Sequence, residues 1–472
     1  MRRVFAGVDV GTGSVRAGLF DEAGCLLGVG KHPIRMWREA GEVVEQSSDD
    51  VWGAVGAAMR EALVDGGVRP EEVAGIGFDA TCSLVAIGGD GRPVTVSLSG
   101  EAQRNVIVWM DHRASAEAED INATGDDVLR YVGGAMSPEM EMPKLLWLRR
   151  HLPAAYDTAA HFFDLTDFLG WRATGSRARS VCTVTCKWGY LPHAGGWSNV
   201  FLARIGLGDL AADGYARIGS EVVPAGSPLG HGLTPEAAAE LGLVAGTPVA
   251  AGLIDAHAGG LGTVGGRTTD GRPGAPEDRI GYIFGTSACI MASTVEPAFV
   301  GGVWGPYRSA MVPGLWLNEG GQSAAGAAVD HIVRSHPAYA EAELQAGAEG
   351  VLGLLERRII ARVANASEAA LLARHRHVLP DFIGNRSPHA DPAVRGAVFG
   401  IGLDATVDDL EIAYVAGLCG IAYGLADVLD ALAAKGVACD TIVASGGASR
   451  SPLVRQILAD ATGKTVVLPD TV

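Results

Sequence analysis

Cysteine, charged residues and long apolar runs are all scarce in this chain of 472 residues. Its seven cysteines are an odd number without framework spacing, which argues against a disulfide-bonded secreted scaffold and favours reduced thiols in a cytoplasm. No uninterrupted apolar stretch is long enough to span a bilayer, and Asp9 interrupts the apolar N-terminal run before it resembles a signal peptide. We therefore expect no membrane partner and a cytoplasmic location.

Positive charge is also in short supply. The chain has 37 Lys and Arg against 54 Asp and Glu, a net charge of −17, which argues against nucleic acid or an anionic membrane as the main partner. An acidic protein can still bind a nucleotide, because backbone amides and magnesium supply local positive charge. The length and the 48% hydrophobic content predict a globular protein of two domains.

One pattern occurs once in each half of the chain: an apolar run, a Gly-Thr bend and a second apolar run. The first copy covers residues 4–20 and the second covers residues 280–291. Other short apolar runs alternate with segments of helical spacing, which indicates an α/β fold. The recurrence predicts two related domains, 1–247 and 248–472.

Residues 9–14, Asp-Val-Gly-Thr-Gly-Ser, form the bend of the first copy. Small residues there let backbone amides and the hydroxyls of Thr12 and Ser14 approach a phosphate, while Asp9 at the strand end can hold hydrated magnesium. A plain hairpin turn is the alternative interpretation.

Two further segments suit the same chemistry. In residues 444–452, the paired Gly446 and Gly447 follow a strand and precede a helix, so a flat ring can lie against the backbone. Asp255 lies where a strand becomes a helix, and a carboxylate there can accept a hydroxyl proton during phosphoryl transfer. The alternatives are a simple strand-to-helix turn and a helix N-cap, respectively.

In this order and spacing, the segments resemble those of the FGGY carbohydrate kinases, which have the actin-like ATPase fold. Residues 9–20 resemble the first phosphate motif, 252–260 the second, and 442–451 the adenosine motif. The resemblance covers nearly the whole chain. It implies two actin-like (ribonuclease H-like) α/β domains with a cleft between them, the first for sugar and phosphate and the second for adenosine, and ATP and Mg²⁺ as cofactors.

The resemblance also implies roles for individual residues. Asp255 would be the general base, and Asp9 and Asp255 would hold magnesium through water. The residues implied to contact ATP and its phosphates are Asp9, Thr12, Gly13, Ser14, Gly285, Thr286, Gln322, Gly446, Gly447, Ala448 and Ser451.

Within the family, residues 78–84, 109–113, 186–188 and 318–323 are similar to segments of the ribulokinases. This likeness implies phosphorylation of D-ribulose to ribulose 5-phosphate, and leaves L-ribulose, xylulose or a pentitol as other acceptors. An actin-fold ATPase without a sugar, or a catalytically idle sugar-binding relative, are the alternatives of other classes. The residues implied to line the sugar pocket are Ala80, Thr81, Asp111, Lys187, Asp255 and Glu319.

Several features depart from the family pattern. Glu141 stands where a small residue or Pro is usual, and Tyr414 and Ala416 replace a small or aliphatic residue and a polar one. A helix normally follows residue 468, so we expect the second domain to lack it, and a homodimer is one assembly that the resemblance allows.

Two other patterns have different chemical readings. Cys182 and Cys186 are spaced like metal ligands, but no second cysteine pair lies near them in the sequence. Residues 260–265 fit the GxGxxG pattern of a dinucleotide oxidoreductase, but the first Gly lies six residues beyond the strand end.

Overall fold

The computed structural model of the protein describes residues 2–40, 42–267 and 274–469, which form two compact units. Unit 1 comprises Met1–Ala258 and Tyr307–Leu315, and unit 2 comprises Gly259–Pro306 and Trp316–Val472.

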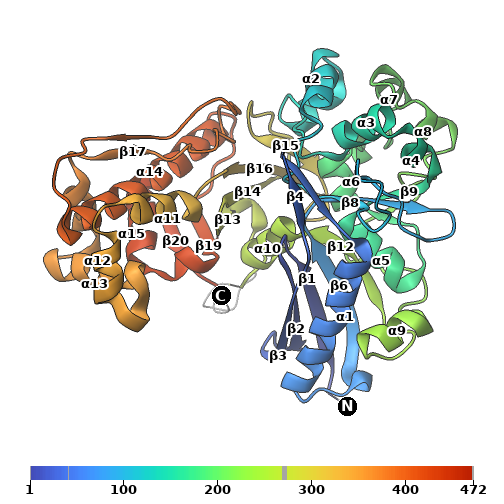
Figure 1. The fold of residues 1–472 in the computed structure, drawn as a ribbon, viewed down its shortest axis with the longest axis horizontal. Coiled ribbons are helices and arrows are strands. Elements are labelled where there is room, and N and C mark those ends of the chain that lie inside the picture. The colour runs from blue at the N-terminus through green and yellow to red at the C-terminus, as the bar shows by residue number, and fades with distance from the viewer. Residues whose placement is uncertain (1, 41, 268–273, 470–472) are drawn as a thin grey trace. The chain divides into compact units, whose positions relative to one another are not determined.

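The central sheet of unit 1 has five strands in the order β12-β6-β1-β2-β3 (Figure 1). The first copy of the repeated pattern forms the antiparallel hairpin that was predicted, and β6 and β12 join it in parallel. Along β1, alternate residues from Val4 to Val10 are buried, as expected for a strand with one face on the core. The strands are β1 Val4–Val10, β2 Ser14–Asp21, β3 Leu26–Pro33, β6 Val73–Ala80 and β12 Val249–Ile254.

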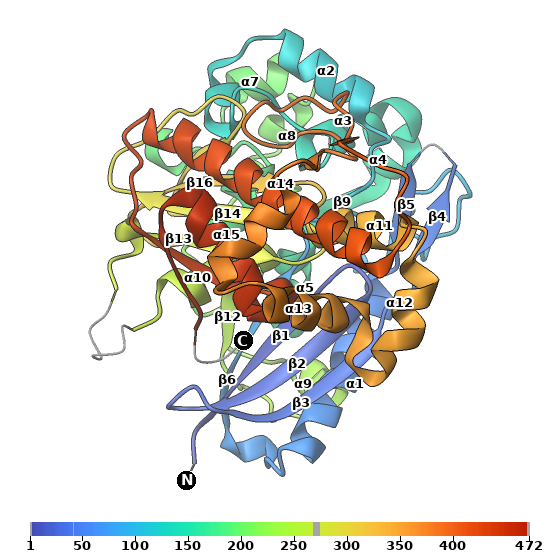
Figure 2. The ribbon, with the colours of Figure 1, turned by 90° about the vertical axis from the view of Figure 1, so that its left-hand side faces the viewer.

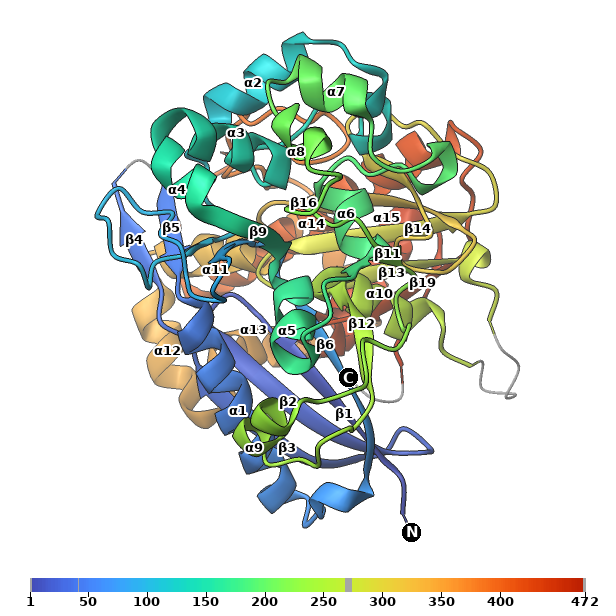
Figure 3. The ribbon, with the colours of Figure 1, turned by 90° about the vertical axis from the view of Figure 1, so that its right-hand side faces the viewer.

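Helix α1 (Ser48–Asp65) packs along this sheet, as Figure 3 shows. The helix starts at a capping residue, because the Ser47 side chain accepts a hydrogen bond from Asp50 N. The approach to β3 is close: a Cβ atom at Gly30 would lie 2.0 Å from the carbonyl oxygen of Ala58. Glycine on β3 therefore permits the helix and the sheet to touch.

A second sheet of unit 1 has the order β4-β5-β8-β7-β9, and β10 pairs with β11. The strands of these two sheets are β4 Trp37–Glu39, β5 Val43–Gln46, β7 Leu84–Gly88, β8 Val106–Ile107 and β9 Ala159–Asp164 in the first, and β10 Arg179–Ser180 and β11 Val222–Val223 in the second. The remaining helices of unit 1 are α2 Ser115–Ala123, α3 Glu141–His151, α4 Pro153–Thr158, α5 Leu165–Thr174, α6 Val181–Lys187, α7 Asn199–Arg204, α8 Asp209–Ala212 and α9 Pro235–Leu241.

The sheet of unit 2 has the order β15-β16-β14-β13-β19-β20. Its last five strands repeat the pairing of unit 1: an antiparallel hairpin β13-β14, an antiparallel third strand β16, and parallel β19 and β20 on the other side. The predicted relation between the two halves is thus visible as one shared strand order. The strands are β13 Arg279–Phe284, β14 Ala288–Thr294, β15 Trp304–Arg308, β16 Trp316–Gln322, β19 Thr441–Ser445 and β20 Thr465–Val467.

The structure divides the chain later than the boundary expected near residue 247. The reason is β12, which is the fifth strand of the first sheet and pairs with β6. Helix α10 (Asp255–Val264) follows β12 and begins in unit 1. The GxGxxG pattern at residues 260–265 lies largely inside this helix, and not in a strand-to-helix phosphate loop.

The long helix α14 (Val407–Ala433) belongs to the core of unit 2 (Figure 2). By length and composition it could cross a membrane, with a mean hydropathy of 1.7 in its most apolar window, but 72% of that window is buried inside the unit. This pattern is typical of a core helix. The other helices and strands of unit 2 are α11 Gly326–Ser335, α12 Tyr339–Ala346, α13 Gly350–Arg362, α15 Pro452–Thr462, β17 His377–Leu379 and β18 Ala397–Phe399.

Candidate active site

Three carboxylates lie at one edge of the sheet of unit 1. Asp9 is near the end of β1, Asp79 is directly paired with it on β6, and Asp255 follows β12. Because these strands are parallel, their carboxyl ends meet at the same edge, where ligands of open α/β sheets bind. Asp9 and Asp255 were predicted from the sequence, and Asp79 was not.

Like charge and burial shape the acid–base behaviour of this edge. Burial raises the pKa of Asp79 to about 9, and the charges of Asp9 and Asp255 and a hydrogen bond with Asp9 act in the same direction. Burial also raises the pKa of Asp255 to about 6, assisted by the charge of Asp9 and opposed by the hydrogen bond from Ala256 N and by His257 and Lys187. Asp255 can therefore accept a proton near neutral pH.

The three carboxylates fit a magnesium ion. Mg²⁺ prefers hard oxygen ligands and usually keeps several of its waters, and these residues offer carboxylate oxygens at one place. A divalent cation would also relieve the repulsion that raises the pKa of Asp79 and Asp255.

The expected phosphate turn follows Asp9 directly. Gly11 N donates to Ser14 O at 3.1 Å and closes the bend around Thr12 and Gly13. Thr12 is held from behind, because Trp109 Nε1 donates to its hydroxyl at 3.0 Å and Gln46 Nε2 donates to its carbonyl at 2.7 Å. The sequence reading did not find this positioning role of Trp109, which is 97 residues away.

Lys187 ends helix α6 and is 98% buried, with only 2% of its surface exposed. Buried lysines are rare without partners, and the charges of Lys187, Asp164, Lys144 and Glu141 all act on the pKa of Cys82, which burial raises. These charged residues therefore lie near enough to Cys82 to act on its thiol, and Cys82 follows Ala80 and Thr81 at the end of β6.

Asp164 Oδ2 in this cluster has no hydrogen-bond partner among the described residues, and neither have Thr185 Oγ1 and Trp188 Nε1, which flank Cys186 and Lys187 in the sequence. Glu141, the departure noted in the sequence, is fully buried and lies 3.4 Å from Lys144 Nζ. Burial raises the pKa of Glu141 to about 7, although the charges of both lysines oppose the shift. Unpaired buried polar atoms of this kind suit a ligand with several hydroxyl groups.

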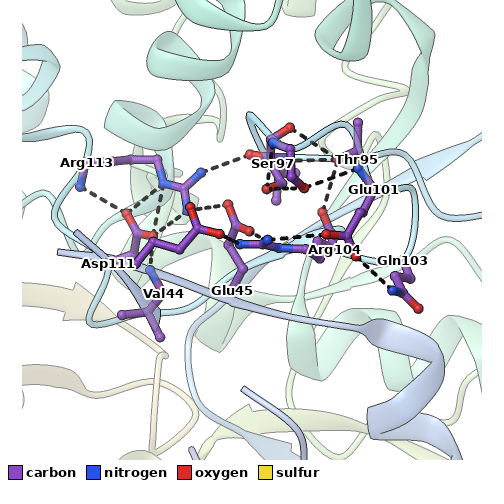
Figure 4. Close-up of polar contacts among 12 residues, drawn as sticks. Val44, Glu45, Thr95, Ser97, Glu101, Gln103, Arg104, Asp111 and Arg113 are labelled. Carbon is purple, nitrogen blue, oxygen red and sulfur yellow. Dashed lines mark hydrogen bonds and ion pairs between the residues drawn. The ribbon is translucent and has the colours of Figure 1, made fainter. Parts of the chain in front are cut away.

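Asp111, which was predicted to line the sugar pocket, lies in a buried hydrogen-bond network. Its buried carboxylate accepts hydrogen bonds from Val44 N at 2.6 Å and from the backbone and guanidinium of Arg113 (Figure 4). Arg113 and Arg104 both bind Glu45, which extends the network. These donors engage both carboxylate oxygens, so Asp111 anchors the segment that carries Trp109, and its contact with a sugar stays a prediction.

Unit 2 contains a cavity of about 760 Å³ between the β13–β14 bend, the turn after β19 and the helices. The structure brings five of the predicted ATP-binding residues together here. They are Gly285, Thr286, Gly447, Ala448 and Ser451. Gly446 precedes three of them in the turn and must be glycine-like there: its φ is +89°, and a Cβ atom would lie 2.4 Å from the carbonyl oxygen of Phe284.

The other two predicted residues of unit 2 lie elsewhere. Gln322 does not line this cavity: its amide donates to Ile421 O at 3.0 Å and its carbonyl accepts from the Tyr282 hydroxyl. Glu319 is buried on β16.

The helical wall of the cavity was not foreseen. Tyr414 on α14, noted in the sequence only as a departure, lines the cavity and donates to Glu356 Oε1 of α13 at 2.8 Å. Asp330 and His331 of α11 complete the polar part of this wall. Only the packing of α11, α13 and α14 brings these residues together, so no local pattern could have found them.

The chain matches two protein-family models: the FGGY family of carbohydrate kinases, N-terminal domain, over residues 4–262, and the C-terminal domain over residues 281–472. A human FGGY carbohydrate kinase domain-containing protein is 46% identical over 100% of this chain and 86% of its own length. The D-ribulokinase of Saccharomyces cerevisiae is 37% identical over 99% of this chain and 69% of its own length.

Among solved structures, a xylulose kinase from Rhodospirillum rubrum has a TM-score of 0.78 at 21% identity, covering 99% of this chain and 86% of that one. A Plasmodium falciparum glycerol kinase has a TM-score of 0.76 at 14% identity, with the same coverage. Similarity at this level concerns the fold alone, which kinases named for different acceptors share.

Proposed function

Since this chain belongs to the FGGY family of carbohydrate kinases and is a ribulokinase-like sugar kinase, we propose that its preferred acceptor is D-ribulose, converted with ATP and Mg²⁺ to D-ribulose 5-phosphate. The D-ribulokinase of S. cerevisiae supports this choice, because its similarity extends over almost the whole chain. Bacterial ribulokinases at 29% identity support a pentulose more broadly.

The observation that carries the proposal is the buried polar cluster around Lys187. Each buried polar group left unpaired costs about 1–3 kcal/mol, so a ligand that pairs several of them gains affinity. A pentulose carries hydroxyls along its whole length, whereas glycerol carries three and would leave part of the cluster unpaired.

The residue roles in this proposal follow the geometry of each unit. Asp255 takes the proton of the attacking sugar hydroxyl, and its pKa near 6 suits a base at neutral pH. We assign the Thr12-Gly13-Ser14 turn of unit 1 to phosphate binding, and within unit 2 we assign Thr286 to phosphate and Gly447, Ala448 and Ser451 to adenosine. Magnesium, when bound through Asp9 and Asp255, would neutralise charge on the phosphates.

A cytoplasmic location is part of the proposal. All seven cysteines lie in the described part of the chain, and no disulfide joins any of them there. Reduced thiols are typical of a cytoplasmic protein.

The test is a panel of acceptors in an ADP-release assay with Mg²⁺: D-ribulose, L-ribulose, D-xylulose, ribitol and glycerol, with a sample without sugar. We expect D-ribulose to have the highest kcat/KM. Lys187→Met should lower that value by about 100-fold or more, since it removes a buried hydrogen-bonding charge, while Lys31→Met, at an exposed lysine of β3, should not.

Each contrary result has a distinct meaning. A better kcat/KM with D-xylulose, ribitol or glycerol would refute the assignment of D-ribulose. ATP turnover that is independent of sugar would identify an ATPase. Sugar binding without ADP release would identify a catalytically idle relative.

A further inference from the structure

Beside the carboxylates of unit 1 lies a second group of side chains that the proposed kinase reaction does not use. Cys182 and Cys186 are four residues apart on helix α6, so both sulfurs face the same side of the helix. The imidazole of His257, in the first turn of α10, faces both of them. All three side chains are fully buried.

We propose that Cys182, Cys186 and His257 form a binding site for a thiophilic divalent cation of the zinc class. This site goes beyond the proposed sugar-kinase function and does not depend on it. The sequence supplied only the cysteine pair, and the structure adds the third ligand from a segment 71 residues further along the chain.

The distances suit this class of ion. His257 Nδ1 lies 3.1 Å from Cys182 Sγ and 3.8 Å from Cys186 Sγ, and all three ligand atoms lie within 4.8 Å of one another. With Zn–S bonds of about 2.3 Å and Zn–N bonds of about 2.0 Å, a tetrahedral ion separates sulfur from nitrogen by about 3.6 Å. Small shifts of the side chains would therefore admit the ion.

The chemistry of the donors also agrees. Two thiolates and one imidazole are soft or borderline ligands that select zinc over magnesium, which prefers oxygen. Two thiolates would balance the two charges of the ion inside the protein. Ile254 N donates to Cys182 Sγ at 3.4 Å, the kind of outer hydrogen bond that orients a ligand sulfur.

The site would tie two parts of the active site together. Cys186 immediately precedes Lys187, and His257 lies two residues after Asp255. An ion held by all three ligands would link the end of α6 to the start of α10. Three protein ligands also leave the fourth position of a tetrahedral ion for a water molecule or another donor.

The first test is a titration of the full-length chain, stripped with a chelator and reduced, with Co²⁺ in excess Mg²⁺. Cobalt bound by thiolates gives a sulfur-to-metal charge-transfer band in the near ultraviolet, which the carboxylates of Asp9, Asp79 and Asp255 cannot give. We expect the band to saturate at one Co²⁺ per chain, to disappear when Zn²⁺ is added, and to accompany a higher melting temperature.

Matched variants locate the ligands. Cys182→Ser and Cys186→Ser should each lower Co²⁺ affinity by about 100-fold or more and remove most of the band, since each removes a direct ligand. Cys82→Ser, at a buried cysteine of the same unit, and Cys25→Ser, at an exposed one, should leave both unchanged.

One measurement uses the wild-type chain, so it remains informative even if the variants do not fold. X-ray absorption of the zinc-loaded wild-type chain should show two sulfur neighbours and at least one nitrogen neighbour. A shell of oxygen and nitrogen without sulfur, a charge-transfer band that persists in the Cys182→Ser/Cys186→Ser double variant, or no band at all would each overturn the proposal.

Discussion

Asp255 follows β12 beside the like charge of Asp9, and its pKa near 6 supports the role of general base that we propose for it. Asp255→Asn keeps the size and the hydrogen bond from Ala256 but cannot accept a proton. We expect kcat to fall by about 10²–10⁴, the usual contribution of a general base, while ADP affinity stays within twofold. Steady-state kinetics and calorimetry of ADP binding measure the two effects.

Asp90→Asn is the control for this change, because Asp90 lies on an exposed turn of the same unit. It should leave kcat unchanged. Full turnover in Asp255→Asn would remove Asp255 from the mechanism and leave Asp79 as the carboxylate to test next.

At the level of single residues, the sequence predicted the groups that stand at visible strand ends. Asp9 and Asp255 each follow an apolar run, so their positions could be inferred locally. Asp79 follows the apolar run 73–78 in the same way, but only the register that pairs it with Asp9 across β1 and β6 shows that it belongs to this group. The structural role of Asp111 is also visible only in the fold, which shows that Val44 N and Arg113 donate to its oxygens.

The turn between β19 and α15 contains two adjacent glycines whose replacement by alanine should affect stability differently. Gly446 has a φ of +89°, and an added Cβ atom would lie 2.4 Å from Phe284 O, whereas a Cβ atom at the adjacent Gly447 would have no neighbour within 4 Å. Gly446→Ala should lower the unfolding free energy by about 2–4 kcal/mol, because strain at positive φ adds to a backbone clash. Gly447→Ala should change it by less than about 1 kcal/mol.

Chemical denaturation of both variants provides the comparison. Since the turn borders the nucleotide cavity, Gly446→Ala should also weaken ADP binding. Equal stability of the two variants would show that the turn relaxes around the added methyl group.

The first turn of α14 predicts a pH dependence of stability. Burial acts to raise the pKa of Asp409, but hydrogen bonds from Arg376 and His336 and the charges of these residues hold it below its usual value. A lowered pKa means that the carboxylate contributes stability above the unfolded pKa of about 3.9, and that this contribution is lost as pH falls through the folded value.

Asp409→Asn should therefore destabilise the protein by about 3 kcal/mol at pH 7, because it leaves Arg376 buried without its partner. The difference from wild type should shrink as the pH is lowered toward 3. Urea denaturation between pH 7 and pH 3 measures it, and a difference that does not change with pH would exclude the carboxylate charge as its cause.

Helices with a mixed surface were easier to predict than helices inside the core. The start of α1 was evident from Ser47 and from apolar residues at helical spacing. Helix α14 is more apolar overall than α1, and by length and composition it would also fit a membrane span. Its burial in unit 2, and with it the position of Tyr414 at the cavity, became visible only in the folded structure.

Over the whole molecule, the repeated hairpin correctly indicated two related units, but it did not indicate where the first unit ends. The strand that completes its sheet, β12, follows β6 only after residues 81–248. The predicted boundary at residue 247 therefore separated β12 from its partner strand β6. Pairing over such a separation leaves no local pattern in the sequence.

A pair of truncated chains tests this boundary. A fragment of residues 1–258 retains β12, whereas a fragment of residues 1–247 lacks it and leaves one edge of β6 unpaired. We expect the shorter fragment to aggregate, because an open edge strand pairs readily with other chains. Soluble yield and light scattering compare them, and equal solubility would show that β12 is dispensable for unit 1.

The late arrival of β12 has a consequence for synthesis on the ribosome. While residues 81–248 are being added, β1, β2, β3 and β6 can already pair, but the sheet cannot be completed until residue 254 has left the exit tunnel. At synthesis rates of about 5–20 residues per second, the nascent chain spends about 10–30 s in this state. Chaperones that shield edge strands would therefore bind the nascent chain during that interval, before Asp255 has reached its position at the end of the sheet.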